Sequence, residues 1–145
     1  SYGLIVDLEP TPWYEVASLG AAARVIEASG RRDVGLVVDA IHWDRAGDTA
    51  QSIAALNPSY FRYLQLCDAP AERPADLPTL LLQARAERLM PGDGGLDLKG
   101  LVRALPAHIP ISLEVPMQTL SKSMPVLERS RLMLEKTRTL LASFA

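Results

Sequence analysis

The chain has 145 residues, which is enough for one domain with a hydrophobic core and too few for two domains of ordinary size. A formal net charge of −2 argues against the basic surface of a nucleic-acid-binding protein, and no apolar run approaches the ~20 residues of a transmembrane helix. Cys67 is the only cysteine, so no intrachain disulfide can form.

These properties predict a cytoplasmic protein that has no signal peptide and does not act at a membrane. The sequence begins almost directly in the apolar run Leu4–Val6, and natural domains seldom begin inside a core element. We therefore expect that an N-terminal part of a larger protein is absent.

The first predicted element is a buried strand, Tyr2–Leu8, which ends at Glu9-Pro10 because proline cannot donate to a strand ladder. A helix follows, with Ser18 as its N-cap and Gly30 as its stop. Its apolar positions recur at helical spacing: Leu19, Ala22, Val25 and Ile26.

The second predicted strand, Val34–Asp39, is apolar on both faces, which is typical of a strand inside a parallel sheet. Asp39 ends this strand, and we expect His42 to lie in the loop that follows it. The next predicted element is a short helix over residues 49–56.

The third predicted strand, Tyr60–Leu66, carries Gln65 near its end and is followed by Asp68. An insertion-like segment rich in proline comes next, with a helix over Leu80–Arg88. The glycine-rich segment Pro91–Gly95 is predicted to be a flexible loop that folds over a ligand.

The last part of the chain predicts a helix over Leu98–Leu105 with Asp97 near its start, and then a strand over Ile109–Val115 that carries Glu114 near its end. A final helix is predicted over Pro125–Phe144. Its apolar side is expected to consist of Val126, Leu127, Leu134, Leu140 and Leu141.

The alternation of strands and helices predicts right-handed crossovers and one parallel sheet. Four such units match half of an eight-unit TIM barrel, whose usual size is ~250 residues. A small open doubly wound sheet is the alternative, but it does not explain why each strand end carries an acid or a possible metal ligand. We therefore predict an α/β fold with a single domain over residues 1–145 that forms half of a TIM barrel.

Parallel strands place their C-terminal ends at one edge of a sheet, so the residues at these ends can converge. Carboxylates in one small volume repel one another unless a divalent cation binds or one acid stays protonated. Oxygen-rich ligation suits Mg²⁺ or Mn²⁺, whereas a nitrogen ligand would admit Co²⁺ or Zn²⁺. The residues at the four predicted strand ends are Glu9, Asp39 with His42, Gln65 with Asp68, and Glu114.

Five motifs in this order resemble the C-terminal half of the sugar phosphate isomerase/epimerase family, the xylose isomerase-like TIM barrels that also include AP endonuclease family 2. The motifs are strand-Glu-Pro, DAIHWDRAG, YLQLCDAP, ERLMPGDGGLDL and SLEVP, and together they cover nearly the whole chain. Members of this family bind a divalent metal at the C-terminal ends of the strands. The resemblance implies that this chain corresponds to roughly strands 5 to 8 of such a barrel.

The resemblance also implies roles for individual residues. Glu9, Asp39 and Glu114 match metal-binding acids of the family, and in the epimerases the residues matched by Glu9 and Glu114 also move protons. Gln65 stands where many members have a histidine ligand, so we expect it to be a weaker metal ligand. Mn²⁺ or Mg²⁺ is the expected cofactor, with Co²⁺ or Zn²⁺ as alternatives.

Three further residues are predicted to bind the substrate, each with a plainer alternative. His42 matches a histidine that contacts the substrate, although a lone histidine often only completes a hydrogen-bond network. Arg88 resembles a basic residue that holds a substrate group, or it is a charge stabilised at a helix C-terminus. Asp68 fits a substrate contact and a loop cap equally well. Trp13 and Trp43 either wall the pocket or cover the core.

The family's chemistry implies that a metal-stabilised enediolate forms when one glutamate removes a proton beside a carbonyl group and another returns it. The leading hypothesis is a sugar or sugar phosphate isomerase or epimerase with a small sugar or keto-polyol substrate. Dehydration of an inosose or a 3-dehydroshikimate-like compound by a lyase is one alternative, and a non-catalytic ligand-binding barrel is another. Half a barrel leaves two unpaired sheet edges, so we expect a missing N-terminal half-barrel or self-association.

Overall fold

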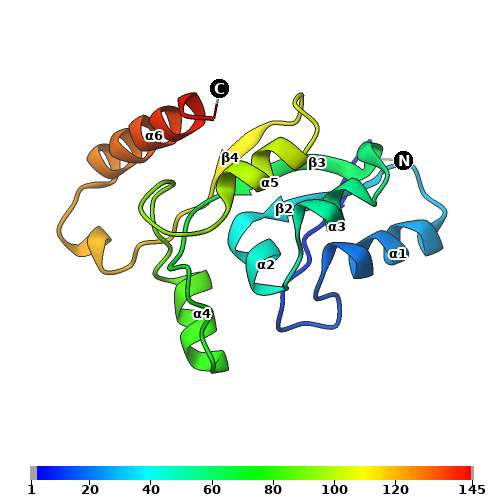
Figure 1. The fold of residues 1–145 in the computed structure, drawn as a ribbon, viewed down its shortest axis with the longest axis horizontal. Coiled ribbons are helices and arrows are strands. Elements are labelled where there is room, and N and C mark those ends of the chain that lie inside the picture. Colours follow the sequence, from blue (N-terminus) through cyan, green and yellow to red (C-terminus); the bar gives the residue numbers. More distant parts are fainter. Residues whose placement is uncertain (1–2, 145) are drawn as a thin grey trace. The chain divides into compact units, whose positions relative to one another are not determined.

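The computed structural model describes residues 3–144 and contains two compact units (Figure 1). The first unit comprises the chain up to Gln65 together with Asp97–Ser112, and the second comprises Leu66–Leu96 together with the chain from Leu113 onward. In the described part of the chain, no helix is both long enough and apolar enough to span a lipid bilayer.

The sheet has four strands in the order β1 (Val6–Leu8), β2 (Val34–Asp39), β3 (Phe61–Leu66) and β4 (Ile111–Leu113). β1 pairs with β2, and β2 pairs with β3, in the parallel direction. This arrangement in chain order confirms the predicted parallel α/β sheet. The two outer strands, β1 and β4, are shorter than the sequence predicts. Tyr2, the first residue of the first predicted strand, lies outside the described residues.

The prediction that the first strand is buried is wrong. Leu4, Ile5 and Val6 are 74%, 63% and 59% exposed. β1 is the outer strand of the sheet and has a neighbour on one side only. Its apolar run is therefore accessible, whereas the similar run of β2, which lies between two strands, is buried from Gly35 onward.

The helices of the first unit begin where the sequence supplies their caps. α1 (Leu19–Ser29) begins at Ser18, whose Oγ accepts the N–H of Ala21 at 3.2 Å, and ends at Gly30 with φ 62°. α1 buries Leu19, Ala22, Ala23 and Ile26, whereas Val25 is 47% exposed. α3 (Ala50–Ala54) and α5 (Leu98–Ala104) begin at Thr49 and Asp97, whose side chains accept backbone N–H groups.

The second unit contains α4 (Leu77–Arg85) and α6 (Val126–Ala142). α4 begins three residues earlier than predicted, because Asp76 caps it and Pro78 is tolerated in the first turn. In α6 the predicted apolar side is only partly covered, with Val126, Leu127 and Leu134 exposed by 69%, 59% and 43%. The predicted side is therefore only partly the packed one: Leu140 and Leu141 are half-buried, and the buried residue of α6 is Thr137, which was not predicted.

We predict that the isolated chain associates through the exposed strand β1. Val6→Lys should lower the apparent mass in size-exclusion chromatography with light scattering toward the 15.8 kDa of one chain, since a lysine on a sheet edge opposes strand pairing. Val25→Lys, which changes an exposed apolar residue of α1, is the matched control and should have no effect. A native chain that stays monomeric at high concentration would contradict the prediction.

Candidate metal site

Asp39 links the end of β2 to the start of the next helix. Its carboxylate Oδ1 accepts the backbone N–H groups of Ile41 at 3.0 Å and His42 at 3.2 Å, so Asp39 is the N-cap of α2 (Ala40–Arg45). The prediction that His42 lies in a loop is therefore wrong, because it lies in the first turn of this helix. The cap also fixes the carboxylate of Asp39, which is only 2% exposed.

Glu9, Asp39 and His42 come together in the first unit. Each offers one possible ligand atom, and these atoms all lie within 4.8 Å of one another. His42 Nε2 is 3.4 Å from Glu9 Oε1, with the histidine side chain 6% exposed and the glutamate side chain 34% exposed. Two carboxylates and an imidazole in this volume are a donor set suited to a divalent cation.

Trp13 packs beside this group. Its ring meets the ring of His42 edge to face, with centroids 5.0 Å apart and an interplanar angle of 85°. Trp43, in contrast, is 6% exposed and belongs to the core. From the sequence, each tryptophan could either wall the pocket or cover the core, and only the packing distinguishes these two roles.

Gln65 lies beside Asp39 in the sheet. The two residues are paired in register across β2 and β3, so their side chains project from the same face. Gln65 Oε1 is buried without a hydrogen-bond partner among residues 3–144, and a buried unpaired acceptor costs about 1–3 kcal/mol. A cation bound by Glu9 and Asp39 would satisfy this oxygen, so the four residues together fit a divalent metal.

Glu114 and Arg88 lie in the second unit, where they contact each other. Arg88 Nη1 is 3.4 Å from Glu114 Oε2 and donates to the backbone oxygen of Glu114 at 3.0 Å. Arg88 Nε also donates to Ala84 O at the end of α4, at 2.7 Å. The predicted helix end at Arg88 is wrong, because α4 ends at Arg85, although Arg88 still donates to a carbonyl of the last turn of α4. The substrate-binding role of Arg88 stays a prediction.

Asp68 is 2% exposed and accepts four backbone N–H groups. Its Oδ2 accepts those of Gly92 at 3.0 Å and Gly94 at 2.9 Å, and its Oδ1 accepts those of Ala69 at 2.9 Å and Leu96 at 3.1 Å. The glycine-rich loop is thus tied to a buried carboxylate. This geometry favours the loop cap over the substrate contact for Asp68.

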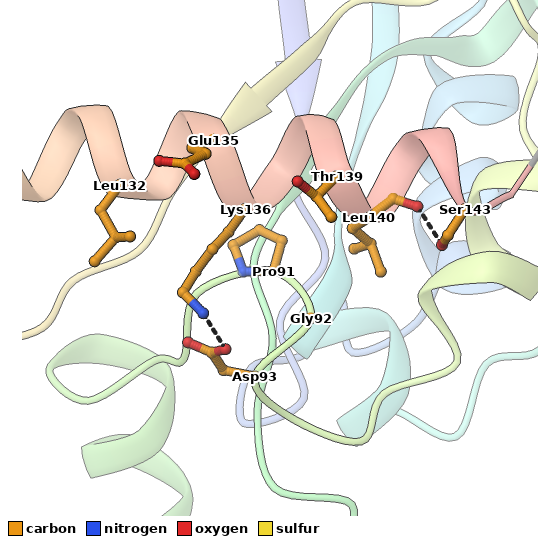
Figure 2. A pocket seen from close by; sticks show the side chains of 9 residues that line it. All are labelled: Pro91, Gly92, Asp93, Leu132, Glu135, Lys136, Thr139, Leu140 and Ser143. Carbon is orange, nitrogen blue, oxygen red and sulfur yellow. Dashed lines mark hydrogen bonds and ion pairs between the residues drawn. The ribbon is translucent and has the colours of Figure 1, made fainter.

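The second unit also has an open groove between residues 91–93 of the glycine-rich loop and α6 (Figure 2). The ion pair of Lys136 Nζ with Asp93 Oδ1, at 2.6 Å, crosses it, and Leu132, Thr139 and Leu140 line the helix side. None of the predicted site residues lines this groove. The candidate site is therefore the group around Asp39.

Residues 1–137 match the model of the xylose isomerase-like TIM barrel family, and the chain belongs to this family. The resemblance stated from the motifs and the predicted fold class are thereby confirmed. Which half of the barrel the chain represents stays a prediction. No curated protein sequence matches the chain significantly.

Three solved structures with the same fold each span about twice the length of this chain. A xylose isomerase domain protein from Alicyclobacillus acidocaldarius subsp. acidocaldarius is 27% identical, with a TM-score of 0.75, and the match covers 98% of this chain and 52% of that one. An IolI protein with a bound zinc atom is 18% identical, with a TM-score of 0.77 and coverages of 97% and 49%. An L-ribulose 3-epimerase is 16% identical, with a TM-score of 0.66 and coverages of 98% and 47%.

The four backbone hydrogen bonds to the Asp68 carboxylate predict that removing this carboxylate destabilises the folded protein. Asp68→Ala should lower the free energy of unfolding by about 2 kcal/mol or more, because buried N–H groups lose a charged acceptor. Urea unfolding measures this loss, and hydrogen exchange at Gly92, Gly94 and Leu96 should accelerate. Asp93→Ala, which removes a solvent-accessible ion pair of the same loop, should cost less than about 1 kcal/mol. Equal losses in the two variants would show that the carboxylate of Asp68 does not organise the loop.

Proposed function

We propose that this chain carries the divalent-metal site of a sugar or keto-polyol isomerase or epimerase. The observation that carries the proposal is the group of Glu9, Asp39 and His42, whose ligand atoms lie within 4.8 Å, with the unpaired oxygen of Gln65 beside Asp39. Family membership supports it, as do the bound zinc of the IolI structure and the activity that names the L-ribulose 3-epimerase.

In this proposal Glu9, Asp39 and Gln65 of the first unit hold the cation. Glu114 stays a ligand that only the family resemblance predicts. Mn²⁺ or Mg²⁺ suits these oxygens, whereas His42 Nε2 would favour Co²⁺ or Zn²⁺ if it also ligates. When bound, the ion supplies Lewis-acid stabilisation of the negative charge that develops on substrate oxygens. His42, held by the α2 cap and packed against Trp13, is rigid enough either to ligate or to hydrogen-bond a substrate hydroxyl.

The protein groups proposed to move protons are the carboxylates of Glu9 and Glu114. In the family's chemistry, which the resemblance implies for this chain, one carboxylate accepts the proton from the carbon next to the substrate carbonyl and another returns a proton to the same carbon from the opposite face, which inverts its configuration. Return to the neighbouring carbon instead gives an aldose or ketose isomer. If a hydroxyl leaves after the first step, the product is dehydrated, so the lyase alternative shares the same residues.

The metal site predicts which substitutions weaken ion binding. Titration calorimetry of the chelator-treated protein with Mn²⁺ should show one site, and Asp39→Asn should weaken it about 10-fold or more because a charged ligand becomes neutral. Gln65→Leu, which removes the amide oxygen, should also weaken it. Glu15→Gln changes an exposed acid close in sequence and is the matched control.

Two results of this titration separate the possible outcomes. If His42→Gln leaves Mn²⁺ affinity unchanged, His42 is not a ligand and its predicted contact with the substrate stays open to a substrate-binding test; if the affinity falls, His42 is a ligand. A native protein that binds neither Mn²⁺, Mg²⁺, Co²⁺ nor Zn²⁺ would contradict the metal site and leave the non-catalytic barrel as the better interpretation.

The proton-transfer role predicts a loss of turnover in Glu114→Gln. We expect kcat to fall about 100-fold or more, because the amide cannot accept a proton. The Mn²⁺-loaded protein would be incubated with a panel of ketoses, including L-ribulose, in D₂O, and deuterium incorporation at carbon followed by NMR. Glu128→Gln on the surface of α6 is the control, and unchanged turnover in Glu114→Gln would refute the role. Mass analysis of the products detects loss of water and identifies a lyase.

A further inference from the structure

The backbone of Arg88 is held on both sides within the second unit. Its own N–H donates to Pro116 O at 2.9 Å, just after β4. The adjacent Leu89 exchanges two hydrogen bonds of 2.9 Å with Asp68, just after β3. Glu87, on the other side, bridges to Met117. Arg88 therefore lies on a short extended segment. This segment bonds to the chain after β3 on one side and to the chain after β4 on the other.

The guanidinium of Arg88 is directed inward and makes contacts along its length. Nε donates to Ala84 O at 2.7 Å, and Nη1 contacts Cys67 Sγ at 3.5 Å. The same Nη1 reaches Glu114 twice, at its backbone oxygen (3.0 Å) and at its carboxylate Oε2 (3.4 Å). The Arg88 side chain is only 3% exposed, whereas that of Glu114 is 44% exposed.

This difference in exposure separates two roles. A guanidinium that binds a substrate must present N–H groups to solvent before the substrate arrives, and Arg88 presents almost none. Glu114, in contrast, has an accessible carboxylate whose inner side is in contact with Arg88. The arginine lies behind the glutamate, where it can orient the carboxylate without touching the substrate.

We propose that Arg88 is a positioning residue for Glu114 and does not bind the substrate. The inference rests on the proposed function, in which Glu114 moves a proton. One nitrogen holds both the backbone and the carboxylate of the same residue, so it restrains the side-chain torsions that lie between them. A proton-transfer group displaced by about 1 Å can lose about 100-fold in rate, which makes such a restraint valuable.

The experiment compares Arg88→Met, Glu114→Gln and the double variant in the D₂O exchange assay. For Arg88→Met we expect a fall in kcat of about 10- to 100-fold with KM changed less than about twofold. In the Glu114→Gln background, Arg88→Met should cause no further loss, because the arginine acts through the glutamate. Arg138→Met on α6 is the control, and Arg88→Lys, which keeps the charge without the planar fork, should recover only part of kcat.

The opposite pattern overturns the proposal. A KM that rises many-fold with kcat retained would show that Arg88 binds the substrate.

Thermal unfolding of the same four proteins gives a readout independent of turnover: the losses in melting temperature for Arg88→Met and Glu114→Gln should not add in the double variant. If the two losses in melting temperature add fully in the double variant, Arg88 does not hold Glu114, and the proposal is wrong. Absence of turnover in the native protein refutes the proposed function. The unfolding data still decide in that case whether Arg88 holds Glu114. If Arg88→Met does not fold, Arg88→Lys takes its place in both measurements.

Discussion

The hydrogen bonds that the Asp39 carboxylate accepts determine the geometry of the candidate site. The acid ends a buried parallel strand, and the first N–H groups of a helix have no partner within the helix itself. By accepting those of Ile41 and His42, Asp39 starts α2 immediately and places His42 in its first turn. The imidazole thereby comes within 3.4 Å of Glu9, which follows the neighbouring strand. A helix cap and a possible metal ligand are thus the same carboxylate.

The register of β3 is the second condition of the site. Leu36 pairs with Phe61 but Val37 pairs with Tyr63, so Arg62 is an extra residue in β3, a bulge. If Arg62 paired regularly with Val37, Leu64 would lie opposite Asp39 and Gln65 would project from the other face of the sheet. The bulged Arg62 lies over Gly35, where a Cβ atom would clash with its Nε, and forms an ion pair with Asp7 at 3.6 Å. A glycine in β2 therefore provides the space for the bulge that aligns the site.

The two compact units contribute separate parts of the proposed machinery. The first contains a complete set of candidate ligands, so ion binding can be examined through its residues alone. The second contains a glutamate held from behind by Arg88 and a loop tied down by Asp68. In both units buried polar groups occupy the ends of strands, where the chain leaves the sheet and its backbone groups need new partners.

The sequence by itself determined the order of most strands and helices, both caps of α1 and the strand ends at which acids collect, because these depend on periodicity and on side chains within a few residues. It also singled out Glu9, Asp39 and Gln65, which lie at or directly after the ends of parallel strands. Only the tertiary structure decided that β1 is exposed, that His42 lies on a helix, and that Asp68 and Arg88 turn inward to backbone groups and to Glu114. The contacts of Asp68 and Arg88 depend on partners up to 28 residues away in the chain, as for Asp68 and Leu96, and no local pattern encodes such contacts. The helix of His42 differs, because its cap Asp39 is only three residues away and the sequence-based prediction missed this local signal.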